Sequence, residues 1–97
     1  MAKRHAPVRP DRSWKPREFL QNAETLAATV RRQLRQWKWG FPDQSGSMDD
    51  AVALSLLIEQ LARKGRTATA AQATDNAEKV DLLIDLLGTE IDDLLAS

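Results

Sequence analysis

The chain has 97 residues, no cysteine and a formal net charge of zero, with 14 Lys and Arg against 14 Asp and Glu. A chain of this length forms one domain with a modest core, and without cysteine it has neither a disulfide framework nor a thiol-based zinc site. Its apolar runs are far shorter than the roughly 20 residues that cross a bilayer. We therefore expect no membrane contact and a cytoplasmic location.

The zero net charge hides an uneven distribution. Residues 1–46 carry ten Lys and Arg against four Asp and Glu, whereas residues 47–97 carry four against ten. Such a division can serve head-to-tail self-association, pairing of the two halves within one molecule, or separate contacts with an anionic and a cationic partner. Composition alone does not choose among these.

Residues 1–13 are basic and almost free of large apolar side chains. They have little apolar surface to bury, so burial cannot offset the entropy lost on ordering them. We therefore predict a flexible N-terminal arm. The arm is either a solvated tail or a segment that binds an anionic partner through Lys3, Arg4 and Arg9. His5, the only histidine, lies in this arm without a scaffold, which argues against a catalytic or metal-binding role.

A long first helix is predicted over residues 16–39. Pro16 suits the first turn of a helix, where a missing N–H is tolerated, and Gly40 followed by Pro42 favours a left-handed stop. Apolar side chains recur along one side of this helix. They are Phe19, Ala23, Leu26, Val30, Leu34 and Trp37.

Basic and aromatic side chains cluster at the end of this helix. Cations that follow a phosphate backbone, interleaved with rings on which bases stack, are typical of nucleic-acid binding. The alternative is that the rings close the end of a helical bundle while the cations stay solvated. The candidates for an anionic or nucleic-acid partner are Arg31, Arg35, Trp37, Lys38 and Trp39.

A second helix is predicted over residues 48–64. Ser47 and Asp50 match a capping box at its start, and Gly65 favours its end. Its main apolar face consists of Ala51, Leu54, Leu57, Ile58 and Leu61. Val52 and Leu56 lie away from this face, so the first half is apolar nearly all round, which indicates a helix contacted from two sides.

A third helix is predicted over residues 70–96, and Thr69 with Gln72 matches a capping box before it. Its apolar residues recur at alternating spacings of four and three, a heptad-like stripe that needs a covering partner. The stripe consists of Ala73, Ala77, Val80, Ile84, Leu87, Ile91 and Leu94. Leu82 and Leu86 fall nearly opposite this stripe, which implies a second contact.

Gly88 makes the continuity of the third helix an open question. Glycine inside a helix costs about 1 kcal/mol relative to alanine, and Thr89 with Asp92 could cap a new short helix. The sequence fits either one kinked helix or two shorter helices.

The third helix has an acidic flank, which is either a solvated face or a partner for a basic ridge on the first helix formed by Arg31, Arg35 and Lys38. The flank consists of Glu78, Asp81, Asp85 and Asp92.

Motifs for catalysis are absent from the sequence: it has no phosphate-binding glycine loop, no Gly-x-Ser-x-Gly elbow and no Cys–His or His–Asp set. We therefore expect no enzyme activity, no cofactor and no metal ion. The patterns predict an all-α, three-helix up-down-up bundle with a long first helix.

Apolar surface in excess of what two neighbouring helices can cover predicts a non-enzymatic adaptor or regulator. It would assemble through the second and third helices, with itself or with a protein partner, while its basic N-terminal half faces an anionic partner. The interface candidates are Val52, Leu56, Leu82, Leu86, Ile91 and Leu94. The alternative is a nucleic-acid-binding regulator or architectural protein that uses the arm and the cluster at residues 31–41.

Overall fold

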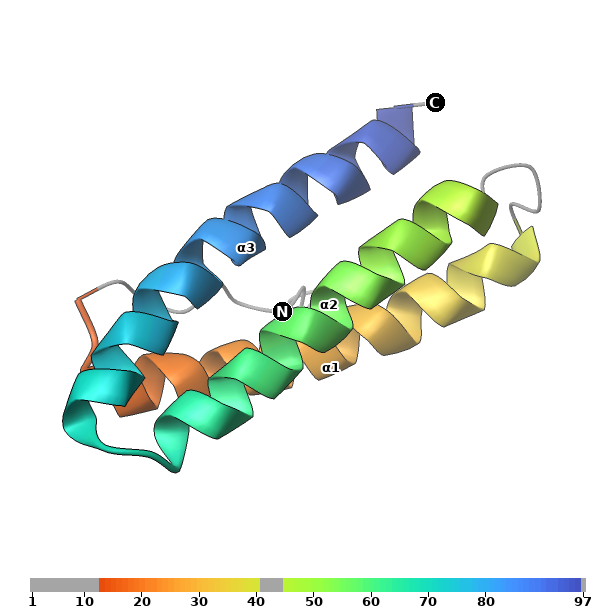
Figure 1. The fold of residues 1–97 in the computed structure, drawn as a ribbon. Coiled ribbons are helices and arrows are strands. Elements are labelled where there is room, and N and C mark those ends of the chain that lie inside the picture. The colour runs from red at the N-terminus through yellow and green to blue at the C-terminus, as the bar shows by residue number, and fades with distance from the viewer. Residues whose placement is uncertain (1–12, 41–44, 97) are drawn as a thin grey trace, which may run out of the picture.

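The structure is a computed structural model that describes residues 13–40 and 45–96, except for the side chains of residues 38, 39, 45 and 47. The described residues form three helices, α1 (Pro16–Gly40), α2 (Ser45–Arg66) and α3 (Ala70–Ala96). Successive helices run in opposite directions, so that α1 and α3 are parallel (Figure 1). The predicted all-α up-down-up fold is confirmed. The predicted arm, apart from Ser13, lies outside the described residues.

The core lies where the three helices meet, and each helix supplies one apolar stripe to it. The stripe predicted for α3 faces this core, since five of its seven members are buried and Ala77 and Ile91 pack partly buried against them. The buried apolar residues are Phe19, Leu20, Ala23, Ala27, Val30 and Leu34 of α1, Met48, Ala51, Ile58 and Ala62 of α2, and Ala73, Val80, Ile84, Leu87 and Leu94 of α3.

Gly65 does not end the second helix, contrary to the sequence prediction. The helix α2 continues to Arg66, and neither Gly65 nor Gly40, which is the last residue of α1, has a positive φ. A Cβ added at Gly65 would lie 2.7 Å from Asn76 Cβ and 2.7 Å from Leu20 Cδ1. Glycine is therefore needed at this position because all three helices approach one another closely there.

Both helix starts that were assigned to capping boxes differ in part from the prediction. The helix α2 begins at Ser45, two residues before the predicted cap at Ser47. At the start of α3 the Thr69 hydroxyl accepts a hydrogen bond from the Gln72 N–H at 3.3 Å, as predicted for an N-cap. The Gln72 side chain does not complete the box, because its amide donates to Asn76 Oδ1 at 2.9 Å.

The helix α3 is continuous through Gly88, so the predicted alternative of two pieces is wrong. Thr89 remains inside the helix, where its hydroxyl donates to the carbonyl of Asp85 at 3.1 Å instead of capping a new start. A Cβ added at Gly88 would meet nothing within 4 Å. The helix therefore tolerates the glycine without any packing need for it.

Two side-chain hydrogen bonds fix the end of the bundle where α2 turns into α3. Asn76, which is 2% exposed, donates from Nδ2 to the carbonyl of Leu61 at 3.0 Å. Arg17 of α1 donates from Nη2 to the carbonyl of Ala68 at 2.6 Å. These bonds hold α3 against α2 and the connecting turn against α1.

Crossing a bilayer requires length together with apolar character, and none of the helices in residues 13–40 and 45–96 combines the two.

Candidate protein-interaction surface

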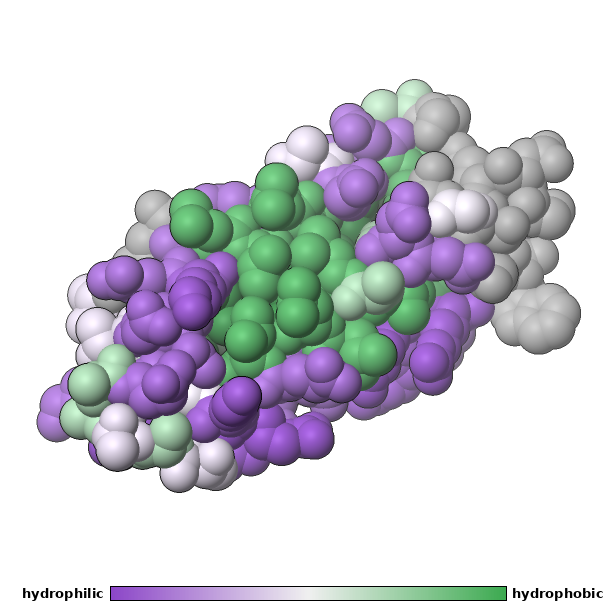
Figure 2. Space-filling model, viewed as in Figure 1, coloured by the Kyte–Doolittle hydropathy of each residue, from purple (hydrophilic) through white to green (hydrophobic). Residues whose placement is uncertain are grey.

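Apolar side chains gather over α2 and α3 on the face shown in Figure 2. Leu57 is 44% exposed, Leu86 is 56% exposed and Leu82 is 66% exposed. Three further leucines beside them are partly buried and pack against the core. We call these six residues the leucine surface: Leu54, Leu57 and Leu61 of α2, and Leu82, Leu83 and Leu86 of α3.

The register of the two helices places these leucines on adjoining edges. Asn76 donates to the carbonyl of Leu61, so these two positions mark where α3 and α2 meet. Leu83 lies seven residues after Asn76, and Leu54 lies seven residues before Leu61. Residues seven apart share a helix face, so Leu83 and Leu54 continue the same two edges along the bundle.

Only part of the predicted interface belongs to the leucine surface. Leu82 and Leu86 lie in it and are exposed, whereas Leu94 is buried in the core and Val52 and Ile91 are packed partly buried against that core. Leu56 is 41% exposed but shares a helical stripe with Glu59, which faces α1. The structure therefore brings together two of the six candidates.

Sequence reasoning missed Leu57 as a surface residue. Its spacing from Leu54 and Leu61, at i, i+3 and i+7, indicated a buried face. The spacing is correct for one face of a helix, but α3 covers only part of that face. Apolar spacing identifies a face that requires cover and does not say whether the same chain provides all of it.

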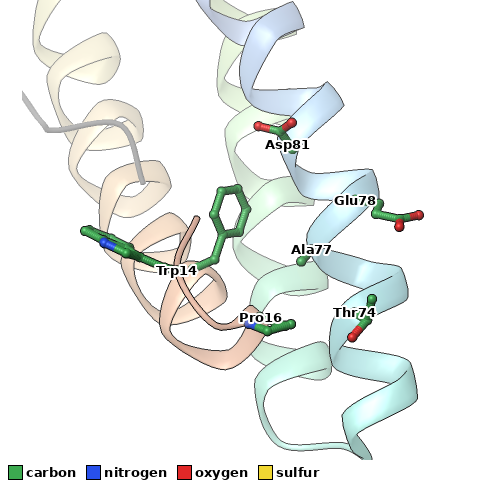
Figure 3. Close-up of a pocket in the computed structure, with 7 residues that line it drawn as sticks. Trp14, Pro16, Thr74, Ala77, Glu78 and Asp81 are labelled. Atoms are coloured by element: carbon green, nitrogen blue, oxygen red, sulfur yellow. The ribbon is translucent and has the colours of Figure 1, made fainter. Parts of the chain in front are cut away.

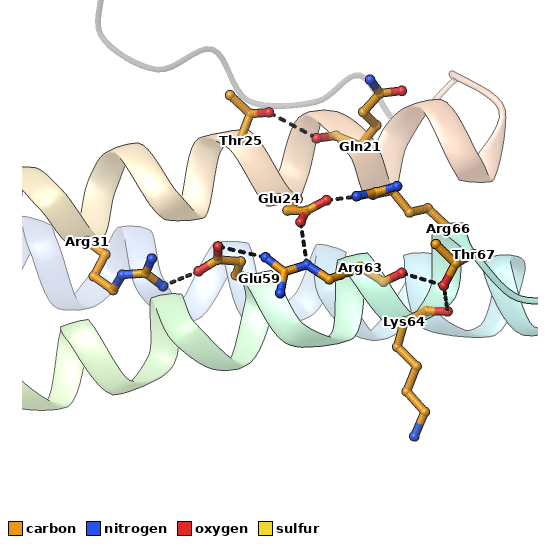
Figure 4. A network of polar contacts seen from close by, with 9 residues as sticks. All are labelled: Gln21, Glu24, Thr25, Arg31, Glu59, Arg63, Lys64, Arg66 and Thr67. Carbon is orange, nitrogen blue, oxygen red and sulfur yellow. Dashed lines mark hydrogen bonds and ion pairs between the residues drawn. The ribbon is translucent and has the colours of Figure 1, made fainter.

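The opposite edge of α2, next to α1, is lined with charged side chains (Figure 4). Glu24 of α1 accepts hydrogen bonds from Arg66 Nε at 2.6 Å and from Arg63 Nε at 2.8 Å. Arg63 Nη2 also contacts Glu59 Oε2 at 3.3 Å, and Glu59 forms an ion pair with Arg31 of α1. We call these five residues the charged network; it joins the two helices along about two turns of α2.

The charged network shifts two pKa values within it. The hydrogen bond from Arg66 lowers the pKa of the Glu24 carboxyl, burial opposes this effect, and Arg63 lowers that pKa further. The pKa of Arg63 is raised, first by its hydrogen bond to Glu24 and then by the negative charge of that carboxylate. Both shifts favour the charged forms that make the contacts.

The basic and aromatic candidates on α1 are in different environments. Arg31 is paired with Glu59 of α2, Arg35 is exposed, and Trp37 packs partly buried against the core. The side chains of Lys38 and Trp39 lie outside the described residues, as do Lys3, Arg4 and Arg9 of the arm. Pairing of Arg31 with the acidic flank of α3 was one prediction, but Arg31 forms its ion pair with Glu59 of α2 instead.

A shallow groove of about 220 Å³ lies between the start of α1 and the first half of α3 (Figure 3). Trp14, Pro16 and Phe19 line one side, and Thr74, Ala77, Glu78 and Asp81 line the other. Pockets for small ligands usually have volumes of about 300 to 1,000 Å³. The groove is smaller than that range, so the leucine surface is the stronger candidate site.

Within residues 13–40 and 45–96, no three His, Asp or Glu side chains lie close enough together to hold a metal ion. Similarity to known proteins adds no assignment, because no protein-family model, no curated protein and no solved structure matches the chain.

Proposed function

We propose that this chain is a small non-enzymatic adaptor or regulatory protein that acts by packing α2 and α3 against a second helical surface. That surface belongs either to another copy of the chain or to a different protein. The observation that supports the proposal is the leucine surface, in which Leu57, Leu82 and Leu86 are each roughly half to two-thirds exposed. Scattered apolar side chains are normal on a protein, whereas a continuous patch usually marks a contact.

The size of the apolar contribution fits reversible association. Complete burial of one leucine side chain stabilises by about 1.5 to 3 kcal/mol, so covering the exposed halves of three leucines contributes a few kcal/mol. Association also carries an entropic cost of at least about 4 kcal/mol. These leucines alone roughly offset that cost, so we expect the association to be weak, to depend on concentration, and to need apolar area from the partner as well.

The proposal also assigns a role to the basic α1 and a location to the chain. Arg32 and Arg35 are exposed on α1, and we propose that they face an anionic partner. Cytoplasmic location is part of the proposal, because the chain contains no cysteine.

Nucleic-acid binding stays a prediction with less support from the described residues. Arg31 is engaged with Glu59 and Trp37 is packed against the core, which leaves fewer groups for phosphates and bases. Retention on a DNA or RNA matrix at low salt, with release as salt is raised, would favour this alternative over the adaptor.

Site-specific photo-crosslinking in the producing cell tests the proposed function. A benzophenone amino acid replaces Leu86 in one strain and Asn22, an exposed residue of α1 away from Arg32 and Arg35, in a control strain. We expect adducts heavier than the 10.9 kDa chain from position 86 and none from position 22. A complete absence of adducts from position 86 would contradict the proposal.

A further inference from the structure

We infer that the leucine surface binds a second copy of this chain, related by a two-fold axis perpendicular to the helices. In that arrangement α2 and α3 of one copy run antiparallel to the same helices of the other. The inference rests on the proposed function and names its partner. It follows from the charges at the two ends of the leucine surface, which differ in sign.

The stripe of α2 that contains Leu57 ends in opposite charges. Asp50 lies seven residues before Leu57 and Lys64 lies seven residues after it, so both share its face. Both side chains are exposed. The α2 part of the leucine surface is therefore acidic at the N-terminal end of the helix and basic at the C-terminal end.

The stripe of α3 that contains Leu86 has its charges in the reverse order along the chain. Lys79 lies seven residues before Leu86, and Glu90 lies four residues after it. Lys79 Nζ is 3.1 Å from Asp75 Oδ2, and both side chains of this pair are more than half exposed. Asp75 offsets the charge of Lys79, so the α3 part is close to neutral toward the start of the helix and acidic toward its end.

The antiparallel packing of α2 and α3 brings like charges to the same end. The contact of Asn76 with Leu61 places the start of α3 beside the end of α2, near Lys64. Lys64 and the Lys79–Asp75 pair therefore lie at one end of the leucine surface, where their net charge is positive, and Asp50 and Glu90 lie at the other. The surface is apolar in the middle with one basic and one acidic end.

Such a surface is complementary to itself in one orientation. A two-fold axis through its centre places the acidic end of each copy against the basic end of the other, and the leucines of both copies meet in the middle. A parallel arrangement would place acidic against acidic and basic against basic. An isologous dimer needs self-complementarity, whereas binding to a different protein does not.

Sedimentation equilibrium of the full chain over a range of concentrations tests the inference. We expect a reversible dimer of twice 10.9 kDa. Lys64→Glu makes both ends of the α2 stripe acidic and Asp50→Lys makes both ends of that stripe basic, so each should raise the dimer dissociation constant roughly tenfold, the effect of two symmetry-related exposed contacts. The double variant restores opposite ends and should return to within about threefold of the wild type.

Lys15→Glu is the matched control, because it makes the same charge change at an exposed position just before α1. It should dimerise like the wild type, and circular dichroism should show the same helix content for all variants. The difference between Lys64→Glu and the wild type should shrink in high salt, since exposed charges are then screened.

A wild-type chain that stays monomeric overturns the inference, and so does a Lys64→Glu variant that dimerises as tightly as the wild type. These failures are distinct from failure of the proposed function. Adducts from position 86 with a mass other than a dimer, together with a monomeric chain, would leave the adaptor function standing and remove the second copy as its partner. No adducts at all would remove both.

Discussion

The two edges of α2 are built from different chemistry although they border the same core. Toward α1, Glu59, Arg63 and Arg66 pair with charged residues of α1 and leave an edge suited to water. Toward α3, the corresponding positions are leucines, of which Leu57 is 44% exposed. The α1 edge is completed within the chain, whereas the α3 edge leaves apolar area exposed.

This contrast shows that two helices can bury their core residues together and still leave the apolar side chains beside that core exposed. Helices α1 and α2 exclude water along their contact and then surround it with ion pairs, each of which contributes little energy by itself. Helices α2 and α3 also bury a central stripe but border it with leucines. The border, and not the core, is where we propose that the chain contacts a partner.

The largest expected effect separates leucines inside the bundle from those on its border. Leu20 is fully buried, so Leu20→Ala should lower the free energy of unfolding by about 2 to 5 kcal/mol. Leu82→Ala, made on a 66% exposed side chain, should change it by less than about 0.5 kcal/mol in dilute solution. Denaturant unfolding monitored by circular dichroism measures both.

The protein concentration sharpens this first prediction. If a partner covers the exposed leucines of α3, association should stabilise the wild type more as the protein concentration rises. Leu82→Ala weakens that association, so its destabilising effect should grow with concentration. The effect of Leu20→Ala should persist at every concentration. Equal and concentration-independent effects at the two positions would break the distinction between core and border.

Glycine substitutions should give opposite signs at the two helical positions. Gly65→Ala places a Cβ 2.7 Å from Asn76 Cβ, and we expect this overpacking to outweigh the gain in helix propensity and destabilise by about 1 kcal/mol. Gly88→Ala meets nothing within 4 Å and should stabilise by up to about 1 kcal/mol. Thermal unfolding checks both, and a stabilising Gly65→Ala would contradict the close helix approach.

The smallest expected effect concerns the charged network. Glu24→Gln should lower the free energy of unfolding by at most about 1 kcal/mol, because Arg63 and Arg66 are partly solvated. The pKa of Glu24 is lowered in the folded chain, so its contribution is fully present above pH 4.5 and is lost as the pH falls through the lower folded pKa.

Unfolding of the wild type and Glu24→Gln at several pH values measures this contribution. The two chains should differ at neutral pH and converge in acid. A difference that persists or grows as the pH falls would show that the carboxylate charge is not what joins α1 to α2.

The sequence was sufficient for the fold because its apolar spacing repeats over many residues. Apolar residues recur at spacings of three and four positions in residues 73–94. This spacing predicted which side of α3 is buried, and the structure confirms it. Gly65 was misassigned as a helix end because its true constraint comes from Leu20, 45 positions earlier in the chain. The need for glycine at this position comes from residues that are close in space but distant in sequence, and residue spacing does not reveal such neighbours.

The candidate site was predictable only in part for the same reason. Leu82 and Leu86 could be predicted as surface residues because they lie opposite the apolar stripe of α3. Leu57 could not, because it belongs to the main apolar face of α2. The pairing of Glu24 with Arg66 spans 42 positions and depends on which faces of α1 and α2 meet. Helix periodicity defines a face but does not identify the face opposite it.

The most direct test of the contrast between the two edges is methyl NMR of the leucines with a soluble paramagnetic probe, at low and at high protein concentration. We predict that the methyl signals of Leu57, Leu82 and Leu86 are attenuated at low concentration and protected at high concentration, while those of Leu20 and Leu34 are protected at both. Protection of Leu82 and Leu86 in the dilute monomer, or their unchanged attenuation at high concentration in both the pure chain and the producing cell's extract, would contradict it.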